Sequence, residues 1–220
     1  MEKLLVIGAS GLLGSKAFEL GSKNYETYGT YRNTNKEGLT QLDVTDRKKV
    51  FDIIESIKPD IVFDSHALNN VDYCETHMDE AWAINVEGSR NIAEASKKVG
   101  AKYVFVSSDY IFSGNKKLYK ETDKPDPLNY LGKTKWALQS FLEIMDIDSI
   151  VAITSGLYGK GSSTGKKSFI PFIVENLQKG TRTEVFSVLS CVYSIVISLF
   201  TLDSSSFVRY ISPPFMSSFR

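Results

Sequence analysis

Three glycines near the start of the chain constrain its fold more than any other feature of the sequence. The stretch "VIGASGLLG", residues 6–14, follows a strand-like apolar run and places Gly8, Gly11 and Gly14 where a helical pattern begins. Glycine permits a tight turn, lets backbone approach a pyrophosphate closely and allows a helix to pack tightly on a strand. The free N–H groups at the start of such a helix favour phosphate oxygens. The stretch therefore predicts a dinucleotide site; the alternative is a glycine-rich turn with a structural role only.

Short apolar runs alternate with helical patterns up to about residue 180. Strands are predicted at 3–7, 26–31, 39–43, 60–65, 102–107 and 149–154. Helices are predicted at 11–21, 46–56, 79–99, 129–145 and 167–179. Continuous runs rich in Val and Ile are typical of strands that are buried on both faces of a parallel sheet. The order predicts an α/β fold, a doubly wound parallel sheet of the Rossmann type over residues 1–160, whose ligand lies at the carboxyl ends of the strands.

The charge balance and the cysteine and histidine spacing exclude several classes of partner. Lys plus Arg and Asp plus Glu number 26 each, so no basic surface favours nucleic acid. The two cysteines and two histidines lack the spacing of metal ligands, and no metal site is predicted. The sequence opens on a strand-like run without the pattern of a secretory signal. Together with two distant cysteines, this favours a cytoplasmic protein.

The last 36 residues differ from the rest in composition. Residues 185–220 hold three charges and ten serines but no Gly, Lys or Glu, and residues 185–202 form an uncharged run of 18, at the lower limit for a membrane span. Three interpretations stay open: a membrane anchor, an ordinary buried segment, or translation in another reading frame. The abrupt change, without linker or turn residues, favours the third, so membrane association is not expected. Residues 161–184 would then begin a truncated or aberrant C-terminal substrate lobe.

The end of the second predicted strand bears on the choice of coenzyme. Sites selective for NAD place an Asp or Glu about 20 residues after the glycines, where it bonds the ribose 2′-hydroxyl. The stretch "GTYRNTNK", residues 29–36, has no acid but contains Arg32, with Lys36 nearby. Since a guanidinium pairs well with a 2′-phosphate, NADP(H) is favoured over NAD(H); the alternative is an ordinary exposed arginine. Asp43 is expected either to accept from the adenine amino group or to serve as a turn residue.

Two later segments carry candidates for catalysis. The stretch "VFVSSDYIFSG", residues 104–114, ends a strand with Ser108. A hydroxyl there can donate to a substrate carbonyl oxygen, or it can cap the end of the strand. The stretch "PLNYLGKTKW", residues 127–136, begins a helix with Tyr130 and carries Lys135. We expect the two tryptophans of the chain, Trp82 and Trp136, in the core.

Taken together, residues 1–180 resemble the extended short-chain dehydrogenase/reductase family, and within it the dTDP-4-dehydrorhamnose reductases. The resemblance is carried, in the order of the family, by "GASGLLG", "LDVTD", "PDIVFDSHALNNVDYCE", "AINVEGSRNIAEASKKVGAKYVFVSSDYIFSG", "YKETDKPDPLNYLGKTK" and "TSGLYG". It implies an NADP(H)-dependent reductase of a nucleotide-linked 4-keto sugar, with Ser108 at the hydroxyl position and Lys135 holding the nicotinamide ribose. Tyr110 is implied as a substrate contact. The predicted coenzyme-binding residues are Gly8, Ser10, Gly11, Leu12, Leu13, Gly14, Arg32, Asp43, Val44 and Lys135.

One position departs from the family and leaves the activity open. Where the family has a tyrosine four residues before the lysine, this chain has Leu131, which cannot donate the proton that the tyrosine would supply. Tyr130 is the predicted substitute acid, although a shift of one residue turns a helical side chain by about 100°. Rescue would therefore require an irregular helix start.

Two further hypotheses follow from this departure. The first is a dinucleotide-binding regulatory protein without turnover, similar to the regulatory beta subunit of methionine adenosyltransferase. Leu131 favours it, whereas the intact Ser108 and Lys135 favour the reductase. The second is a truncated or misframed product that folds only in part. For the reductase, a nucleotide sugar is the expected small-molecule partner, and pairing of two copies into a homodimer is a hypothesis.

Overall fold

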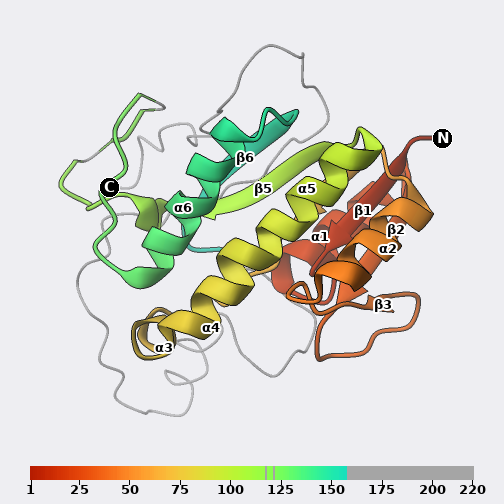
Figure 1. The fold of residues 1–220 in the computed structure, drawn as a ribbon, viewed down its shortest axis with the longest axis horizontal. Helices are drawn as coiled ribbons and strands as arrows, with labels where there is room; N and C mark the ends of the chain where they lie inside the picture. The colour runs from red at the N-terminus through yellow and green to blue at the C-terminus, as the bar shows by residue number, and fades with distance from the viewer. Residues whose placement is uncertain (117, 121, 158–220) are drawn as a thin grey trace, which may run out of the picture.

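The described part of the chain is built around one parallel sheet of six strands in the order β3-β2-β1-β4-β5-β6 (Figure 1). The structure is a computed structural model that describes residues 1–116, 118–120 and 122–157. The predicted helix at 167–179 and the run 185–202 lie outside this part. All neighbouring strands pair in parallel. The strands are β1 (Lys3–Ile7), β2 (Glu26–Tyr31), β3 (Thr40–Gln41), β4 (Ile61–Asp64), β5 (Lys102–Ser108) and β6 (Ser149–Thr154).

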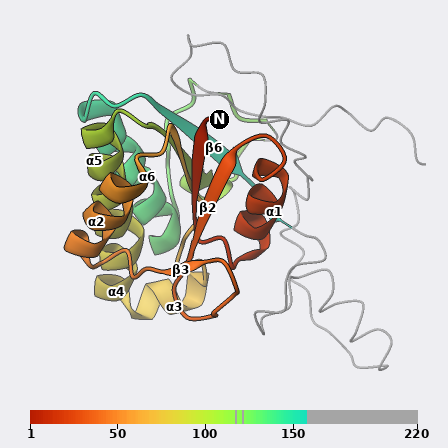
Figure 2. The same cartoon turned by 90° about the vertical axis from the view of Figure 1, so that its right-hand side faces the viewer.

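Helices cover both faces of this sheet, as the edge-on view in Figure 2 shows. Helix α1 lies on one face, and α2, α4, α5 and α6 lie on the other (Figure 2). The helices are α1 (Leu12–Gly21), α2 (Arg47–Ile57), α3 (Val71–Thr76), α4 (Met78–Trp82), α5 (Ser89–Val99) and α6 (Tyr130–Ile144), with a π-helical turn η1 (Ala83–Gly88) and a 3-10 turn η2 (Asp109–Ile111). The arrangement confirms the predicted doubly wound α/β fold.

The apolar run of β1 shows why the strands read as continuous hydrophobic segments. Successive side chains of a strand point to opposite faces of the sheet. Leu4 and Val6 therefore enter the core beneath α1, while Leu5 and Ile7 enter the larger core beneath α2, α5 and α6. Because both faces are covered, neither set of side chains needs to be polar.

Three expectations about the elements need correction. The predicted strand at 39–43 is only two residues long as β3. The helix predicted at 79–99 is continuous in outline but contains η1, in which Gly88 lies so close to the Val44 side chain that an added Cβ would meet it at 2.5 Å. Trp82 and Trp136 are exposed rather than in the core.

Candidate functional site

The turn between β1 and α1 requires glycine at two of its positions. Gly8 adopts φ +79°, in the left-handed region that favours glycine, and a Cβ there would lie 3.2 Å from the backbone of His66. A Cβ on Gly14 would lie 2.2 Å from the Gly8 carbonyl oxygen and 2.7 Å from Ser65 Oγ. Helix α1 thus packs directly on the turn and on the segment that follows β4, as the glycine pattern predicts.

The first turn of α1 faces this close-packed turn with its backbone N–H groups. The N-cap residue Gly11 has no side chain to occupy them, and the first turn contains no acidic residue. A helix start of this kind attracts phosphate oxygens. The predicted contacts Ser10, Leu12 and Leu13 lie here, and Leu13 also packs against the core beneath α1. The close backbone approach and the helix start fit the pyrophosphate of a dinucleotide.

Arg32 follows β2 directly, and it is already paired. Its Nε lies 3.4 Å from Asp43 Oδ2, and both side chains are about half exposed. Burial raises the pKa of Asp43, but hydrogen bonds from the Thr45 N–H and hydroxyl, with the Arg32 charge, outweigh it and lower that pKa. The structure therefore brings the two predicted coenzyme residues, Arg32 and Asp43, together. A half-exposed ion pair of this kind is weak, so an added phosphate can compete with Asp43 for the guanidinium.

Val44 is a predicted coenzyme residue whose side chain is taken up by packing. It is buried, and its Cγ2 would meet a Cβ added to Gly88 at 2.5 Å. Its carbonyl oxygen accepts from Asn91 Nδ2 over 3.1 Å. The side chain thus faces the η1 turn, and the proposed coenzyme contact stays a prediction.

Ser108 ends β5 at the carboxyl edge of the sheet, as predicted. Its hydroxyl donates to Asp109 Oδ1 over 3.2 Å and accepts from the Tyr110 N–H over 3.3 Å, so it also caps the short turn η2. Burial raises the pKa of Asp109, although hydrogen bonds from Ser108 and the backbone act in the opposite direction. Tyr110, the predicted substrate contact, is exposed. Asp109 is a site residue that sequence reasoning missed, even though it stands next to Ser108.

Lys135 reaches into the sheet edge from α6. The residue is buried, its Nζ donates to the Val106 carbonyl oxygen over 2.9 Å, and the ammonium lies 4.7 Å from the centre of the Phe105 ring. Burial lowers the pKa of Lys135 to about 8, against the Asp64 carboxylate, which raises it. A buried lysine with a lowered pKa at a strand end is typical of a functional site.

The start of α6 is fixed by two side chains from different segments. The N-cap Asn129 accepts from the Gly132 N–H over 2.8 Å, and Glu75 of α3 accepts from the Tyr130 N–H over 2.6 Å. A Cβ on Gly132 would lie 2.1 Å from the Tyr110 carbonyl oxygen, so the helix start also presses on η2. These contacts fix the position of the first turn of α6 and the rotation of this helix, which carries Lys135.

Leu131 stands at the position of the family tyrosine and is fully packed. It is buried in a small apolar cluster with Cys74 and Ala81, from α3 and α4. Tyr130 lies against the same cluster. Burial and the nearby Asp79 carboxylate raise the pKa of the Tyr130 phenol. Tyr130 makes no hydrogen bond with Ser108 or Lys135 among the described residues.

Asp64 is a second residue that sequence reasoning missed. It ends β4, is fully buried, and accepts from the Tyr103 hydroxyl and from His66 Nδ1, each over 2.5 Å. The signal in the sequence was an acidic residue at the last position of a buried strand, in "IVFD". With Gly8 after β1 and Ser108 at the end of β5, Asp64 shares the carboxyl edge of the sheet.

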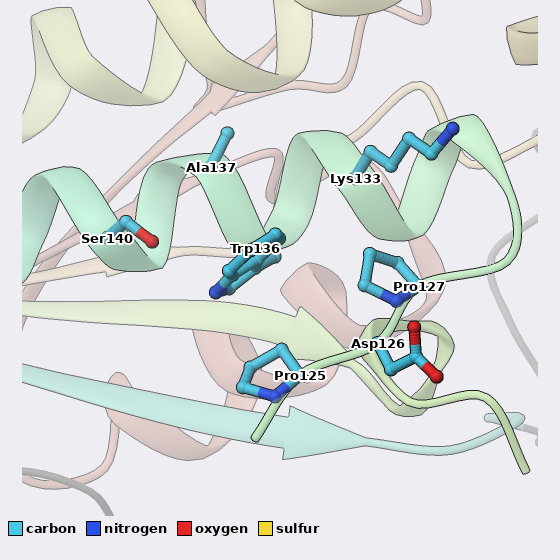
Figure 3. A pocket seen from close by; sticks show the side chains of 7 residues that line it. All are labelled: Pro125, Asp126, Pro127, Lys133, Trp136, Ala137 and Ser140. Atoms are coloured by element: carbon cyan, nitrogen blue, oxygen red, sulfur yellow. The ribbon is translucent and has the colours of Figure 1, made fainter.

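A cavity of about 550 Å³ lies on the outer face of α6, away from Lys135. Figure 3 shows the segment around Pro127 facing Lys133 and Trp136 across it. The cavity is lined by Pro125, Asp126, Pro127, Lys133, Trp136, Ala137 and Ser140. None of the predicted site residues lines it.

No group of His, Cys, Asp and Glu in residues 1–157, apart from the two omitted positions, is placed to hold a metal ion. No helix within that same part of the chain is long and apolar enough to cross a membrane.

Comparison with known proteins identifies relatives over most of the chain. A family model described as the RmlD substrate binding domain matches residues 1–188. The dTDP-4-dehydrorhamnose reductase of Aggregatibacter actinomycetemcomitans is 33% identical over 171 residues, which are 77% of this chain and 56% of the relative. Methionine adenosyltransferase 2 subunit beta of Bos taurus is 31% identical over 159 residues, 72% of this chain and 48% of the relative. The chain thus spans about half the length of these relatives.

A solved structure agrees with the same family. The crystal structure of dTDP-4-dehydrorhamnose reductase from Bacillus anthracis str. Ames in complex with NADP superposes with a TM-score of 0.73 at 32% identity. The match covers 81% of this chain and 60% of that one.

Proposed function

This chain belongs to the family described as the RmlD substrate binding domain, and from that membership we propose that it binds NADP(H) at the glycine turn and reduces a nucleotide-linked 4-keto sugar. The observation that carries the proposal is the shared edge of the sheet. The start of α1 follows β1, the hydroxyl of Ser108 ends β5, and the buried ammonium of Lys135 bonds to β5, so all three lie toward the carboxyl edge of the sheet, where β4 separates β1 from β5. Ligands of doubly wound sheets bind at this edge.

The residues at this edge of the sheet have two proposed roles, ligand binding and the chemical step. The coenzyme, when bound, supplies a hydride to the carbonyl carbon. Ser108, whose hydroxyl already donates to Asp109, turns that donor to the carbonyl oxygen and stabilises the charge that develops there. Lys135 donates to the ribose of the nicotinamide in place of its present bond to the Val106 carbonyl. Tyr110, exposed beside them, contacts the sugar.

The preference for NADP(H) rests on Arg32. Residues 29–36, at the end of β2, contain no acid that could select the ribose 2′-hydroxyl of NAD. Asp43, which follows β3, forms an ion pair with Arg32. A 2′-phosphate would take over the guanidinium, because a bidentate phosphate contact is stronger than a half-exposed carboxylate at 3.4 Å. The NADP in the related reductase structure supports the same choice.

The proton donor of the proposed reaction depends on the first turn of α6. The Leu131 side chain has no acidic proton and cannot act as the general acid. Tyr130 can act as this acid only if the first turn of α6 rotates its phenol away from Asp79 and Cys74. The bond between Glu75 and the Tyr130 N–H would have to break or follow such a rotation.

A second function is favoured by the packing of Leu131. Its burial against Cys74 and Ala81 closes the place from which a phenol would act, and this suits a dinucleotide-binding regulatory protein without turnover. The relative methionine adenosyltransferase 2 subunit beta supports this alternative.

One experiment separates the two functions. The full chain is titrated with NADPH and NADH by fluorescence and is then assayed for NADPH oxidation with a 4-keto nucleotide sugar. Binding with turnover supports the reductase, and binding without turnover supports the regulatory protein. Absence of binding to either nucleotide contradicts both.

A further inference from the structure

The carboxylate of Asp64 is a buried charge with an unusually complete set of partners. It is fully buried, and it accepts from the Tyr103 hydroxyl over 2.5 Å, from His66 Nδ1 over 2.5 Å and from the His66 N–H over 3.2 Å. Burial raises the pKa of Asp64, but the charge of His66 and the bonds from His66 and Tyr103 outweigh it and hold that pKa below its ordinary value. Asp64 is therefore an anion inside the protein.

The ring of His66 completes this arrangement because both of its nitrogens face acceptors. Nδ1 faces Asp64 Oδ1, and Nε2 lies 3.1 Å from the Ile84 carbonyl oxygen, in the π-helical turn η1. The ring thus connects the end of β4 to η1 through its two nitrogens. The backbone of His66 also lies under Gly8, which ties the pair to the glycine turn.

Lys135 is the other cation near Asp64, and it reaches the same place from α6. In the sheet, Asp64 pairs with Phe105, and the Lys135 ammonium lies 4.7 Å from the centre of the Phe105 ring. Among the described residues, its ammonium donates to a backbone carbonyl, that of Val106. No carboxylate bonds Lys135 directly in the described residues, so Asp64 acts on it through space.

We propose that Asp64 is a positioning residue of the coenzyme site, whose buried carboxylate keeps Lys135 as an ammonium ready to hold the nicotinamide ribose. The inference rests on the proposed binding of a nicotinamide dinucleotide. The ionisable groups around Asp64 come from three elements: His66 from the segment after β4, Tyr103 from β5 and Lys135 from α6. The remaining contact of His66, on η1, is a carbonyl. The negative charge of Asp64 thus favours the charged form of Lys135.

The first arm of the test follows Lys135 itself. The full chain is labelled with ¹³C-lysine, the Lys135 signal is assigned by its loss in Lys135→Arg, and its titration is followed by NMR. The wild type is expected to titrate near pH 8. In Asp64→Asn the midpoint is expected to fall by on the order of one pH unit, the usual effect of losing a nearby opposite charge. Asp60→Asn, which removes an exposed carboxylate at the other end of the same strand, is expected to leave it unmoved.

A second variant keeps the test decisive if Asp64→Asn does not fold. Asp64→Ser removes the same charge with a smaller side chain that can still hydrogen bond to its neighbours, and the Lys135 midpoint is expected to fall as in Asp64→Asn. Asp64→Glu keeps the charge and is expected to leave the midpoint close to that of the wild type. An equal fall in Asp64→Ser and Asp64→Glu would indicate a structural role, because only the first variant removes the carboxylate.

The second arm follows NADPH affinity between pH 6 and 9. Asp64→Asn is expected to bind as the wild type at pH 6, where Lys135 is charged in both, and about fivefold more weakly at pH 8, the ratio of ammonium fractions that a one-unit shift gives. A loss of NADPH affinity in Asp64→Asn that is the same at every pH overturns the proposal. If the Lys135 midpoint is the same in the variants as in the wild type and NADPH still binds, the role of Asp64 is overturned but the coenzyme site is not. If the Lys135 midpoint moves but the protein binds no NADPH, the coenzyme site is overturned, and the positioning role falls with it.

Discussion

The Asn85 side chain donates to the Thr134 hydroxyl over 3.2 Å and so joins the π-helical turn η1 to the helix that carries Lys135. The same amide accepts from the Leu68 N–H over 2.8 Å and donates to the Leu68 carbonyl over 3.1 Å. This one buried side chain thus pairs with the backbone N–H and carbonyl of Leu68, in the segment after β4, and links that segment to α6. Since buried polar groups are costly when unpaired, this amide holds together the two segments between which the site lies.

Asn85→Ala is expected to destabilise the protein by about 1–3 kcal/mol, because it leaves the Leu68 N–H without its partner and the Leu68 carbonyl with only the weak Cys74 thiol donor. Urea unfolding measures the change. Asn115→Ala, which removes an exposed amide bonded only to Ser113, is the control and is expected to change stability by no more than about 0.5 kcal/mol. Equal effects of the two substitutions would contradict the bridging role of Asn85.

The parts of this fold that sequence reasoning predicted are those specified by local chemistry. The run at 3–7 and the glycines that follow it need only a buried strand and a close turn, and both predictions are confirmed. The interruption at η1 was not predictable from periodicity, because it depends on how closely Gly88 approaches Val44 across the fold.

The site divides in the same way. Ser108 could be placed from the end of its strand, and Lys135 from the resemblance to the reductase family. The partnership of Asp64 with His66 and Tyr103 could not, because it joins residues whose contact exists only once β4 and β5 are paired. The surroundings of Leu131 depend in turn on α3, which was absent from the predicted helices. Sequence pattern predicts the elements, but it does not predict which side chains face one another between them.

Leu131→Tyr tests whether the missing phenol limits turnover. If the coenzyme and carbonyl are positioned as proposed, restoring a general acid is expected to raise the rate of NADPH oxidation by about 100- to 10,000-fold. The larger side chain enters a packed cluster, so stability is expected to fall by about 1–3 kcal/mol. Leu131→Phe has nearly the same size without the hydroxyl and is expected to show the loss of stability alone. A gain of rate in the phenylalanine variant would rule out the phenol as the cause.

Gly14→Ala tests the close approach of α1 to the glycine turn. Its Cβ would lie 2.2 Å from the Gly8 carbonyl oxygen, which is backbone and cannot move aside without shifting the turn. We expect NADPH binding to fall below detection in a fluorescence titration. Gly156→Ala places its Cβ in open space and is expected to bind as the wild type does. Wild-type affinity in Gly14→Ala would mean that the turn takes no part in coenzyme binding.

Asp109→Asn tests the cost of burying a carboxyl beside Ser108. The pKa of Asp109 is raised in the folded protein, so folding favours its protonated form. The carboxyl therefore costs no stability below its pKa in the unfolded chain, and it destabilises the fold increasingly as the pH rises through its higher pKa in the folded protein. Asparagine has no proton to lose and removes this cost. The variant is expected to be more stable than the wild type at pH 7.5, with a smaller difference below pH 3.8, the ordinary pKa of the carboxyl. Asp123→Asn is the opposite case, because Lys116 lowers the pKa of Asp123. That control is expected to lose stability at pH 7.5.

Arg32→Ala tests the choice between the two coenzymes at the end of β2. The guanidinium is the charged partner proposed for the 2′-phosphate, and hydrogen bonds to charged groups are worth about 1.5–3 kcal/mol. NADPH affinity is therefore expected to fall about ten- to hundredfold, while NADH affinity changes little, because NADH lacks the phosphate. Lys36→Ala removes another cation from the same segment and serves as the matched control. Asp43→Asn, which releases Arg32 from its ion pair at 3.4 Å, is expected to raise NADPH affinity slightly. Parallel losses for both nucleotides in Arg32→Ala would assign the arginine to the fold of the loop and leave the preference for NADP(H) without support.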